Sequence, residues 1–167
     1  MNSIHAVRSE TAMSNTSAPL TDLYREVVMD HHREPHGRVQ LAHIDAEAEG
    51  KNPSCGDEVK MQLQLDGDRI VALAVLSHGC AISTASGSML AELLEGRHLD
   101  EARQIADTFK AAMHGDTPPA EVDLGDLEAL LGVRKFPVRI KCALLPWVTL
   151  LDDLLSQAVA NREAQDG

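Results

Sequence analysis

Residues 58–76 read EVKMQLQLDGDRIVALAVL, and this stretch decides the fold class. From Glu58 to Leu65 apolar and polar residues alternate strictly, which is the period of a strand with one buried face. Asp66-Gly67-Asp68 is typical of a hairpin turn, and Ile70–Leu76 returns as a second, more buried strand. The sequence therefore predicts an antiparallel pair of strands.

Helical periodicity lies on both sides of this hairpin. Apolar residues recur at helical spacing from Leu20 to Val28, in a helix expected to end before Pro35. Residues 39–49 are a weaker strand candidate. Further helices are predicted over residues 82–95, 100–114 and 124–131, and a last one from Pro137 to about residue 159. Pro146 would collide with the Cys142 carbonyl in a continuous helix, so we expect a kink or a late helix start there.

The chain has 167 residues, a length that favours one domain with a real core. The first 18 residues are rich in Ser, Thr, Asn and Ala without a period, so we expect a disordered tail over 1–18, with Met13 as an alternative start. The domain is predicted over 19–160, followed by a C-terminal tail over 161–167.

Charge and hydropathy exclude several classes of partner. Fifteen Lys and Arg stand against 26 Asp and Glu, a formal charge of −11, and no basic stripe is present. Nucleic acid and anionic membrane are therefore poor partners. No apolar run approaches the roughly 18 residues of a membrane span, and residues 1–17 lack the apolar core of a signal peptide. We expect a cytoplasmic protein.

The odd number of cysteines, three, argues against a disulfide framework and favours metal binding or thiol chemistry. Cys55, Cys80 and Cys142 all fall at the ends of predicted elements, where their side chains can converge on one rim of the sheet. Three unrelated buried thiols are the alternative, and spacing alone leaves the two interpretations about equal.

The run Cys55-Gly56-Asp57 tips this balance towards metal. Gly56 allows a tight turn, so that a thiolate and a carboxylate can face one point. Three thiolates and one carboxylate form a tetrahedral donor set that suits Zn²⁺. Taken by itself, however, Asp57 is more typical of an Asx turn that starts a strand.

Other polar residues are weaker candidates. His31, His32 and His36 could suggest a metal cluster, but their place at a helix C-terminus favours polar residues that complement the helix dipole. His78 is kept only as a spare ligand. The serines at 83, 86 and 88 indicate a small-residue packing face, and Trp147 fits either the core or a partner surface.

Four motifs in register make the chain resemble the SufU family, the zinc-bearing sulfurtransferase branch of the U-type iron–sulfur assembly proteins. The motifs are Leu23-Tyr24 with Asp30-His31 and Pro35, then Asn52-Pro53-Ser54-Cys55-Gly56-Asp57, Gly79-Cys80-Ala81-Ile82-Ser83, and Lys135-Phe136-Pro137-Val138-Arg139-Ile140-Lys141-Cys142. The Isc-type scaffolds have a His where this chain has Lys141, and they lack the extra segment around 115–132. The resemblance implies an α+β domain, a small antiparallel β-sheet with helices packed on it.

The resemblance also implies a site and a reaction. Zinc would be held by Cys55, Asp57, Cys80 and Cys142. Cys55 would be released from the metal when a cysteine desulfurase of the SufS type offers a replacement ligand, and would then accept persulfide sulfur. That sulfur would pass to a downstream SUF scaffold. Arg139 is a possible supporting cation beside Cys142, because four anionic ligands leave the site negative.

Two other functions use the same residues. Thiolates accept iron as well as zinc, so the site could instead be a scaffold for a [2Fe–2S] cluster. An adaptor with purely structural zinc is the second alternative. We expect a monomer or a weak homodimer.

Overall fold

The structure is a computed structural model that describes the backbone of residues 17–166 and the side chains of residues 22–165. The elements in chain order are α2 (Ser17–Arg33), β1 (Ala46–Asn52), β2 (Asp57–Asp66), β3 (Arg69–His78), α3 (Ala81–Leu94), α4 (Leu99–Met113), the 3-10 helix η1 (Gly125–Lys135), α5 (Pro137–Thr149), the π-helical η2 (Leu150–Leu154) and α6 (Leu155–Asp166). The expected α+β class is confirmed.

The sheet has the order β1-β2-β3, and both strand pairs are antiparallel. The predicted hairpin is confirmed: Val59, Met61 and Leu63 are buried along one face of β2, and Gly67 takes a positive φ of 63° in the turn to β3. The sheet is therefore half-covered, as the period-two pattern requires.

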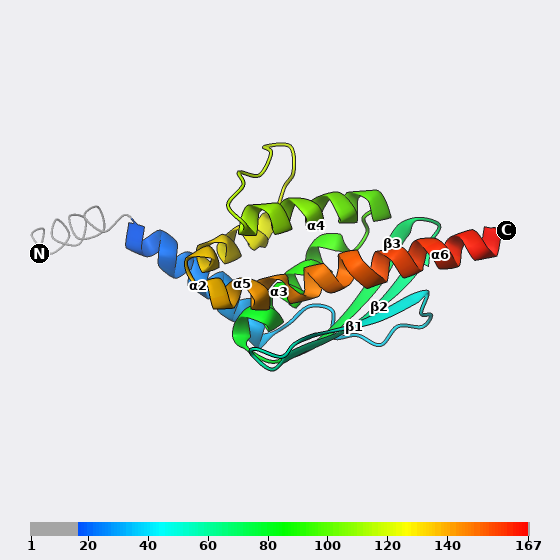
Figure 1. Cartoon of the computed structure of the whole chain (residues 1–167), viewed down its shortest axis with the longest axis horizontal. Coiled ribbons are helices and arrows are strands. Elements are labelled where there is room, and N and C mark those ends of the chain that lie inside the picture. The colour runs from blue at the N-terminus through cyan, green and yellow to red at the C-terminus, as the bar shows by residue number, and fades with distance from the viewer. Residues whose placement is uncertain (1–16, 167) are drawn as a thin grey trace, which may run out of the picture.

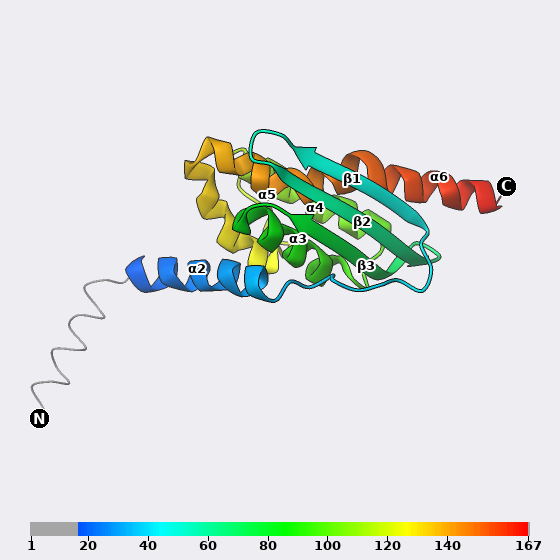
Figure 2. The same cartoon turned by 90° about the horizontal axis from the view of Figure 1, so that it is seen from below.

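The expectation of a strand over 39–49 is wrong for its first half, because β1 begins only at Ala46. Before that point the chain runs along the β3 edge and crosses to the opposite edge of the sheet (Figure 2). Along the way the Val75 N–H donates to the Gly37 carbonyl at 2.9 Å, and the Leu65 N–H donates to the Asp45 carboxylate at 2.7 Å. A crossing segment cannot pair continuously with either edge strand.

Three layers make up the domain (Figure 1). Helices α3 and α5 cover one face of the sheet, and α4 packs on α5 as the outermost layer. The other face of the sheet carries no helix among the described residues (Figure 2). The largest fully buried side chains lie between the layers and include Met61, Leu63, Ile70, Met89, Leu90, Phe109, Leu127 and Trp147.

The small residues of α3 bring this helix close to its neighbours, as predicted. A Cβ on Gly87 would lie 2.9 Å from both the Ser77 hydroxyl and a Val75 methyl, so α3 approaches β3 too closely for a larger residue. Ser86 of this helix also forms hydrogen bonds to α5. The Ser86 hydroxyl donates to the Ala143 carbonyl at 2.5 Å and accepts the indole N–H of Trp147 at 3.1 Å. Trp147 is thereby placed in the core.

The last helix is longer than predicted. It begins at Pro137 as expected, so the late start suggested by Pro146 is wrong, and a π-helical turn follows that proline at Leu150–Leu154. The stretch Pro137–Gln165 contains an 18-residue window of mean hydropathy 1.3, so the expectation that no apolar run approaches the length of a membrane span is wrong. In the fold 67% of that window is buried, as is typical of a core helix.

Parts of both predicted tails belong to helices. Residues 161–166, expected as a C-terminal tail, continue helix α6. Ser17 and Ala18 belong to α2, whereas residues 1–16, including the alternative start at Met13, lie outside the described part of the chain.

Candidate metal centre

One end of the sheet gathers the three cysteines. The turn from β1 to β2, the end of β3 and the N-termini of α3 and α5 all lie at this end (Figure 2). Cys55 lies in the turn, where the Asn52 carbonyl accepts the N–H groups of Cys55 at 3.2 Å and Gly56 at 2.9 Å. Gly56 takes a φ of 71°, a left-handed conformation that favours glycine, so the predicted tight turn is confirmed.

Asp57 begins β2 on the face that packs against the helices, and it is only 1% exposed. Its Oδ1 accepts the Cys80 N–H at 2.9 Å, and its Oδ2 lies 3.9 Å from the Cys80 sulfur. A Cβ on Gly79 would overlap this carboxylate, so glycine is required immediately before Cys80. A buried carboxylate is thus fixed beside a thiol.

Cys80 caps the N-terminus of α3. Its sulfur accepts the Ser83 N–H at 3.5 Å, and its backbone is extended, as is typical of an N-cap residue. The N-terminal end of a helix carries partial positive charge, which stabilises a thiolate at this position.

Cys142 lies in α5 and is fully buried. Burial, followed by hydrogen bonding to Asp57, Cys55 and Cys80, raises the pKa of this thiol well above its ordinary value. The side-chain amide of Asn52 points an N–H at the Cys142 sulfur from 3.9 Å. A buried thiol of this kind becomes an effective ligand when a cation replaces its proton.

The four side chains converge. The ligand atoms of Cys55, Asp57 and Cys142 lie within 4.8 Å of one another. Cys80 is not part of this group of three, but its sulfur lies 3.9 Å from Asp57 Oδ2, at the edge of the cluster. These residues come from the β1–β2 turn, the start of β2, the start of α3 and α5. Two sulfurs and a carboxylate oxygen share one point, and the sulfur of Cys80 is next to the carboxylate, so the cluster offers the donor types of a soft-metal site. This cluster is able to bind a metal ion.

A hollow of about 1040 Å³ opens beside Cys55 and Cys80. Its remaining walls are Ala81, Ile82, Val133, Lys135, Phe136, Pro137, Val138 and Arg139. Arg139 is exposed, and its pKa is raised, chiefly by hydrogen bonding to Cys142 and next by the charge of Cys80. Arg139 therefore lines the same hollow as Cys55 and Cys80.

His78, kept as a spare ligand, lies elsewhere. It pairs with Glu58 across β2 and β3, and because side chains alternate along a strand, it lies on the face opposite Asp57. It lines a separate hollow on the outer face of the sheet with Glu49 and Lys60.

The prediction for the histidines of α2 is wrong for His31, which is buried and bonded to other segments instead of lying as a polar residue at the helix end. Sequence reasoning also missed Asn52 and Gly79 as parts of the site. Both belong to the quoted motifs, but their roles depend on contacts with Cys142 and Asp57 that no local pattern reports.

Residues 23–143 match the sequence profile of the family described as "NifU-like N terminal domain". The chain is 40% identical over 142 residues to the iron–sulfur cluster assembly scaffold protein IscU of Streptococcus pyogenes, covering 85% of this chain and 89% of the relative. It is also 40% identical over 134 residues to the zinc-dependent sulfurtransferase SufU of Bacillus subtilis, covering 80% and 90%.

A solved structure agrees with these similarities. The crystal structure of a putative iron–sulfur cluster assembly scaffold protein for the SUF system, from Fervidobacterium islandicum, superposes with a TM-score of 0.69 at 38% identity. The aligned region covers 77% of this chain and 93% of that one. The N-terminal part of a NifU-like protein from Brucella abortus shares the fold with a TM-score of 0.73 at 22% identity.

Proposed function

Because the chain belongs to the NifU-like N-terminal domain family, with IscU and SufU among its relatives, we propose that it is an iron–sulfur cluster assembly protein that accepts sulfur from a cysteine desulfurase. The convergence of Cys55, Cys80, Cys142 and Asp57 at the rim of an open hollow carries this proposal. We place the protein in the cytoplasm, where thiols stay reduced.

Zinc is the ion that fits these residues best, with Cys55, Asp57, Cys80 and Cys142 as its ligands. The donor set has four members, the number that a tetrahedral site needs, and three of them are sulfurs. The sequence similarity to a zinc-dependent sulfurtransferase supports the same choice. When bound, zinc would hold the cysteines as thiolates at neutral pH, although a free thiol is mostly protonated there. Asn52 and Arg139 would offset the negative charge of the ligands.

Cys55 is the residue that would carry the sulfur. Cys142 is buried within α5, and Cys80 is held by its role as the cap of α3. Cys55 lies in a four-residue turn, is half-buried, and borders the hollow through which a partner can approach. Access therefore favours Cys55 and Cys80 over Cys142, and freedom to move favours Cys55 over Cys80, which is held as the cap of α3.

The transfer is a thiol–persulfide exchange. The Cys55 thiolate attacks the terminal sulfur of a cysteine persulfide on the desulfurase, and a new S–S bond forms on Cys55. The S–S bond of the donor persulfide breaks, and the donor cysteine leaves as a thiolate. The electrons balance without a further oxidant or reductant, and a scaffold of the SUF type would then take the sulfur from Cys55.

The surface beside Cys55 suits a docking partner. Phe136 is 60% exposed and Val138 is 64% exposed, and both line the hollow. Large apolar side chains that stay exposed next to a reactive group are characteristic of a protein-binding surface. A SufS-type desulfurase docked there would present its persulfide to Cys55 while covering these side chains.

Assembly of a [2Fe–2S] cluster on the same ligands is the second candidate. It is supported by the similarity to the streptococcal IscU, which is named a scaffold, and by the ability of thiolates to bind iron. The colour of the purified protein separates the two, because a zinc protein is colourless and a [2Fe–2S] protein is brown.

The deciding experiment measures metal content together with desulfurase turnover for the wild type and for Cys55→Ala. We expect zinc in the wild type, a several-fold stimulation of the desulfurase, and a mass increase of one sulfur atom on Cys55. Cys55→Ala should abolish that increase. Normal sulfur acceptance by Cys55→Ala would contradict the role of Cys55, and zinc without any stimulation would favour an adaptor with a structural ion.

A further inference from the structure

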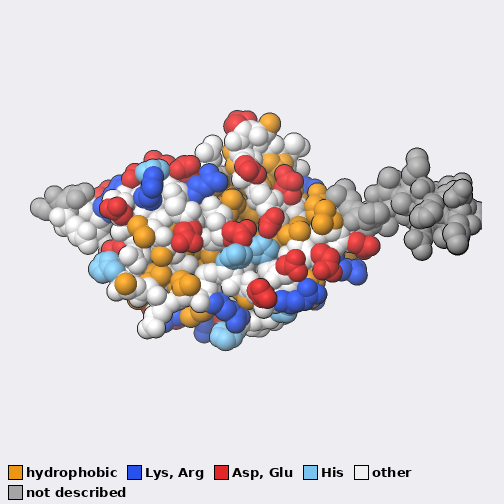
Figure 3. Space-filling view, turned by 180° about the vertical axis from the view of Figure 1, so that it is seen from behind, with side chains coloured by type: hydrophobic (Ala, Val, Ile, Leu, Met, Phe, Trp, Pro, Cys, Tyr) orange, Lys and Arg blue, Asp and Glu red, His pale blue; other side chains and the backbone are white. Residues whose placement is uncertain are grey.

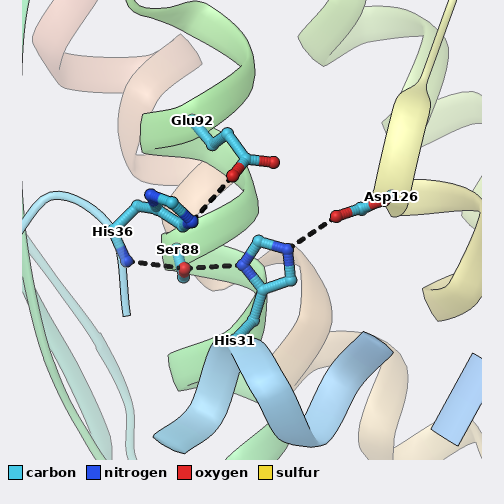
Figure 4. Close-up of polar contacts among 5 residues, drawn as sticks. All are labelled: His31, His36, Ser88, Glu92 and Asp126. Atoms are coloured by element: carbon cyan, nitrogen blue, oxygen red, sulfur yellow. Dashed lines mark hydrogen bonds and ion pairs between the residues drawn. The ribbon is translucent and has the colours of Figure 1, made fainter. Parts of the chain in front are cut away.

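The other end of α3 carries a second group of ligand side chains. His31 of α2, Glu92 of α3 and Asp126 of η1 have ligand atoms within 4.8 Å of one another, and His36 contacts Glu92 (Figure 4). These four residues come from three helices and the segment after α2. On the face drawn in Figure 3, imidazoles lie directly beside carboxylates, and Lys and Arg are scattered among the acidic groups.

His31 is the fixed member of the group. Its side chain is 6% exposed, its Nδ1 lies 2.7 Å from the Ser88 hydroxyl, and its Nε2 lies 2.8 Å from Asp126 Oδ2. Ser88 also accepts the backbone N–H of His36 at 2.8 Å, so one hydroxyl positions both histidines. Metal-binding histidines commonly use one ring nitrogen for the ion and the other for a hydrogen bond of this type.

The remaining members face solvent. His36 Nε2 lies 2.7 Å from Glu92 Oε2, with the two side chains 51% and 46% exposed, and the Asp126 side chain is 48% exposed. In Figure 4, His31 points towards Asp126 and His36 towards Glu92, and the two imidazole rings have their centroids 5.4 Å apart. A buried imidazole thus forms the base of the group, and an ion can enter from the exposed side.

We propose that His31, His36, Glu92 and Asp126 form a second metal site, for a divalent first-row transition metal such as Zn²⁺ or Fe²⁺. Two imidazoles and two carboxylates supply two nitrogen and two oxygen donors with a charge of −2, which neutralises the ion. This donor set is harder than the cysteine site and favours different ions from those that thiolates select.

Binding of the ion would change the tautomer of His31, and the ring would keep one proton in both states. The distances fit a metal-free network in which the Ser88 hydroxyl donates to Nδ1 of His31 and the Nε2–H donates to Asp126. With metal on Nε2, the proton moves to Nδ1 and is donated to Ser88, which keeps its bond from the His36 N–H. The Ser88 hydroxyl therefore has a hydrogen-bond partner on His31 in both states. Binding is expected to weaken as pH falls, because protons compete with the ion for imidazole nitrogens and carboxylate oxygens.

The second site is separate from the cysteine site. Cys80 and Glu92 are 12 residues apart along α3, which corresponds to roughly 18 Å at the rise of an α-helix. An ion there would tie α2 and η1 to α3 without touching the sulfurs. The proposal therefore stands apart from the sulfur-transfer function and is tested independently of it.

The test is a Co²⁺ titration of the full chain after its cysteine site has been filled with Zn²⁺, with the zinc content measured before and after. We expect one further Co²⁺, with weak visible bands, no thiolate charge-transfer absorption and no zinc released. His36→Gln and Asp126→Asn should each weaken this binding by about tenfold or more. Both side chains are half-exposed, so these variants should fold.

His43→Gln is the matched control, because His43 is also an exposed histidine with a carboxylate partner, Asp45, at 2.9 Å. Its Co²⁺ affinity should equal that of the wild type. Paramagnetic shifts of the His31 ring resonances should accompany binding. The proposal is overturned if no Co²⁺ binds beyond the cysteine site, or if Asp126→Asn and His43→Gln bind it equally well.

Discussion

The two ends of α3 offer contrasting ligand chemistry on one helix. At the N-terminal end, Cys80 joins two other sulfurs and a buried carboxylate beside an apolar hollow. In the C-terminal half, Glu92 joins imidazoles and a second carboxylate at a hydrated surface. The first set suits soft metals and thiol chemistry, whereas the second suits harder, more labile binding.

The difference teaches how burial selects the donors. Sulfur tolerates the core, because a protonated thiol behaves as a small apolar group until a cation replaces the proton. Carboxylates need water or partners, and the one carboxylate of the cysteine site, Asp57, is buried only because it accepts the Cys80 N–H. Between the two ends, Ser86 and Trp147 fix α3 against α5.

The largest expected effect comes from removing Trp147, which fixes α3 against α5 between the two ends. Trp147→Ala should lower the free energy of unfolding by about 3–5 kcal/mol, because it opens a cavity under α3 and removes the indole N–H that the Ser86 hydroxyl accepts. Phe136→Ala, at a side chain that is 60% exposed, is the control and should change stability by less than about 0.5 kcal/mol. Urea unfolding of both variants checks this, and equal losses would contradict the packing described for Trp147.

The next effect concerns metal affinity at the cysteine end of α3. Asp57→Ala should weaken metal binding at the cysteines by at least about tenfold, because it removes one ligand and the acceptor of the Cys80 N–H. Glu58→Ala, on the opposite face of β2, should leave binding unchanged. Competition with a chromogenic chelator measures both affinities. A loss in Glu58→Ala as large as that in Asp57→Ala would show that the carboxylate acts only through general charge.

The third prediction concerns the metal-free protein. Because the pKa of Cys142 is raised in the folded state, folding favours the protonated thiol. Stability should be constant below the pKa of an unfolded thiol, about 8.5, and should fall as pH rises above it. Urea unfolding at about pH 7 and about pH 9.5 should show this loss, and Cys142→Ala should reduce it. A loss that is unchanged in Cys142→Ala would assign it to another group.

Cys55 and Cys142 should also differ in how fast their thiols react. In the metal-free protein, iodoacetamide should modify half-buried Cys55 well before buried Cys142, as mass spectrometry of timed digests would show. Faster modification of Cys142 would remove the reason for assigning sulfur transfer to Cys55.

The smallest effect is expected at the rim of the hollow. Arg139→Gln should reduce the rate of sulfur acceptance a few-fold while leaving the fold intact, because it removes an exposed cation from the hollow that Cys55 and Cys80 line. Lys135→Gln removes a cation from the same hollow and is the control. Equal rates for the two variants would reduce Arg139 to a general contributor of positive charge.

Sequence patterns predicted the hairpin and most helices, since strict alternation over residues 58–65 and helical periodicity are local properties. The same patterns placed a strand over residues 39–45, where the chain instead crosses between sheet edges, because a crossing is set by topology rather than by residue type.

The convergence of the cysteines was expected from their positions at element ends together with the family resemblance. The structure groups Cys55 and Cys142 with Asp57 and places the Cys80 sulfur 3.9 Å from that carboxylate. Burial of His31 was not predictable, because its partners Ser88 and Asp126 are 57 and 95 residues away. Long-range contacts of this kind leave no periodic trace in the sequence.

X-ray absorption at the zinc edge, on the purified full chain, tests the central claim most directly. Three sulfurs at about 2.3 Å and one oxygen at about 2.0–2.2 Å are predicted around the ion, with the sulfur count falling by one in Cys55→Ala. A shell made only of nitrogen and oxygen, or a sulfur count unchanged in that variant, would contradict a zinc centre built from Cys55, Asp57, Cys80 and Cys142.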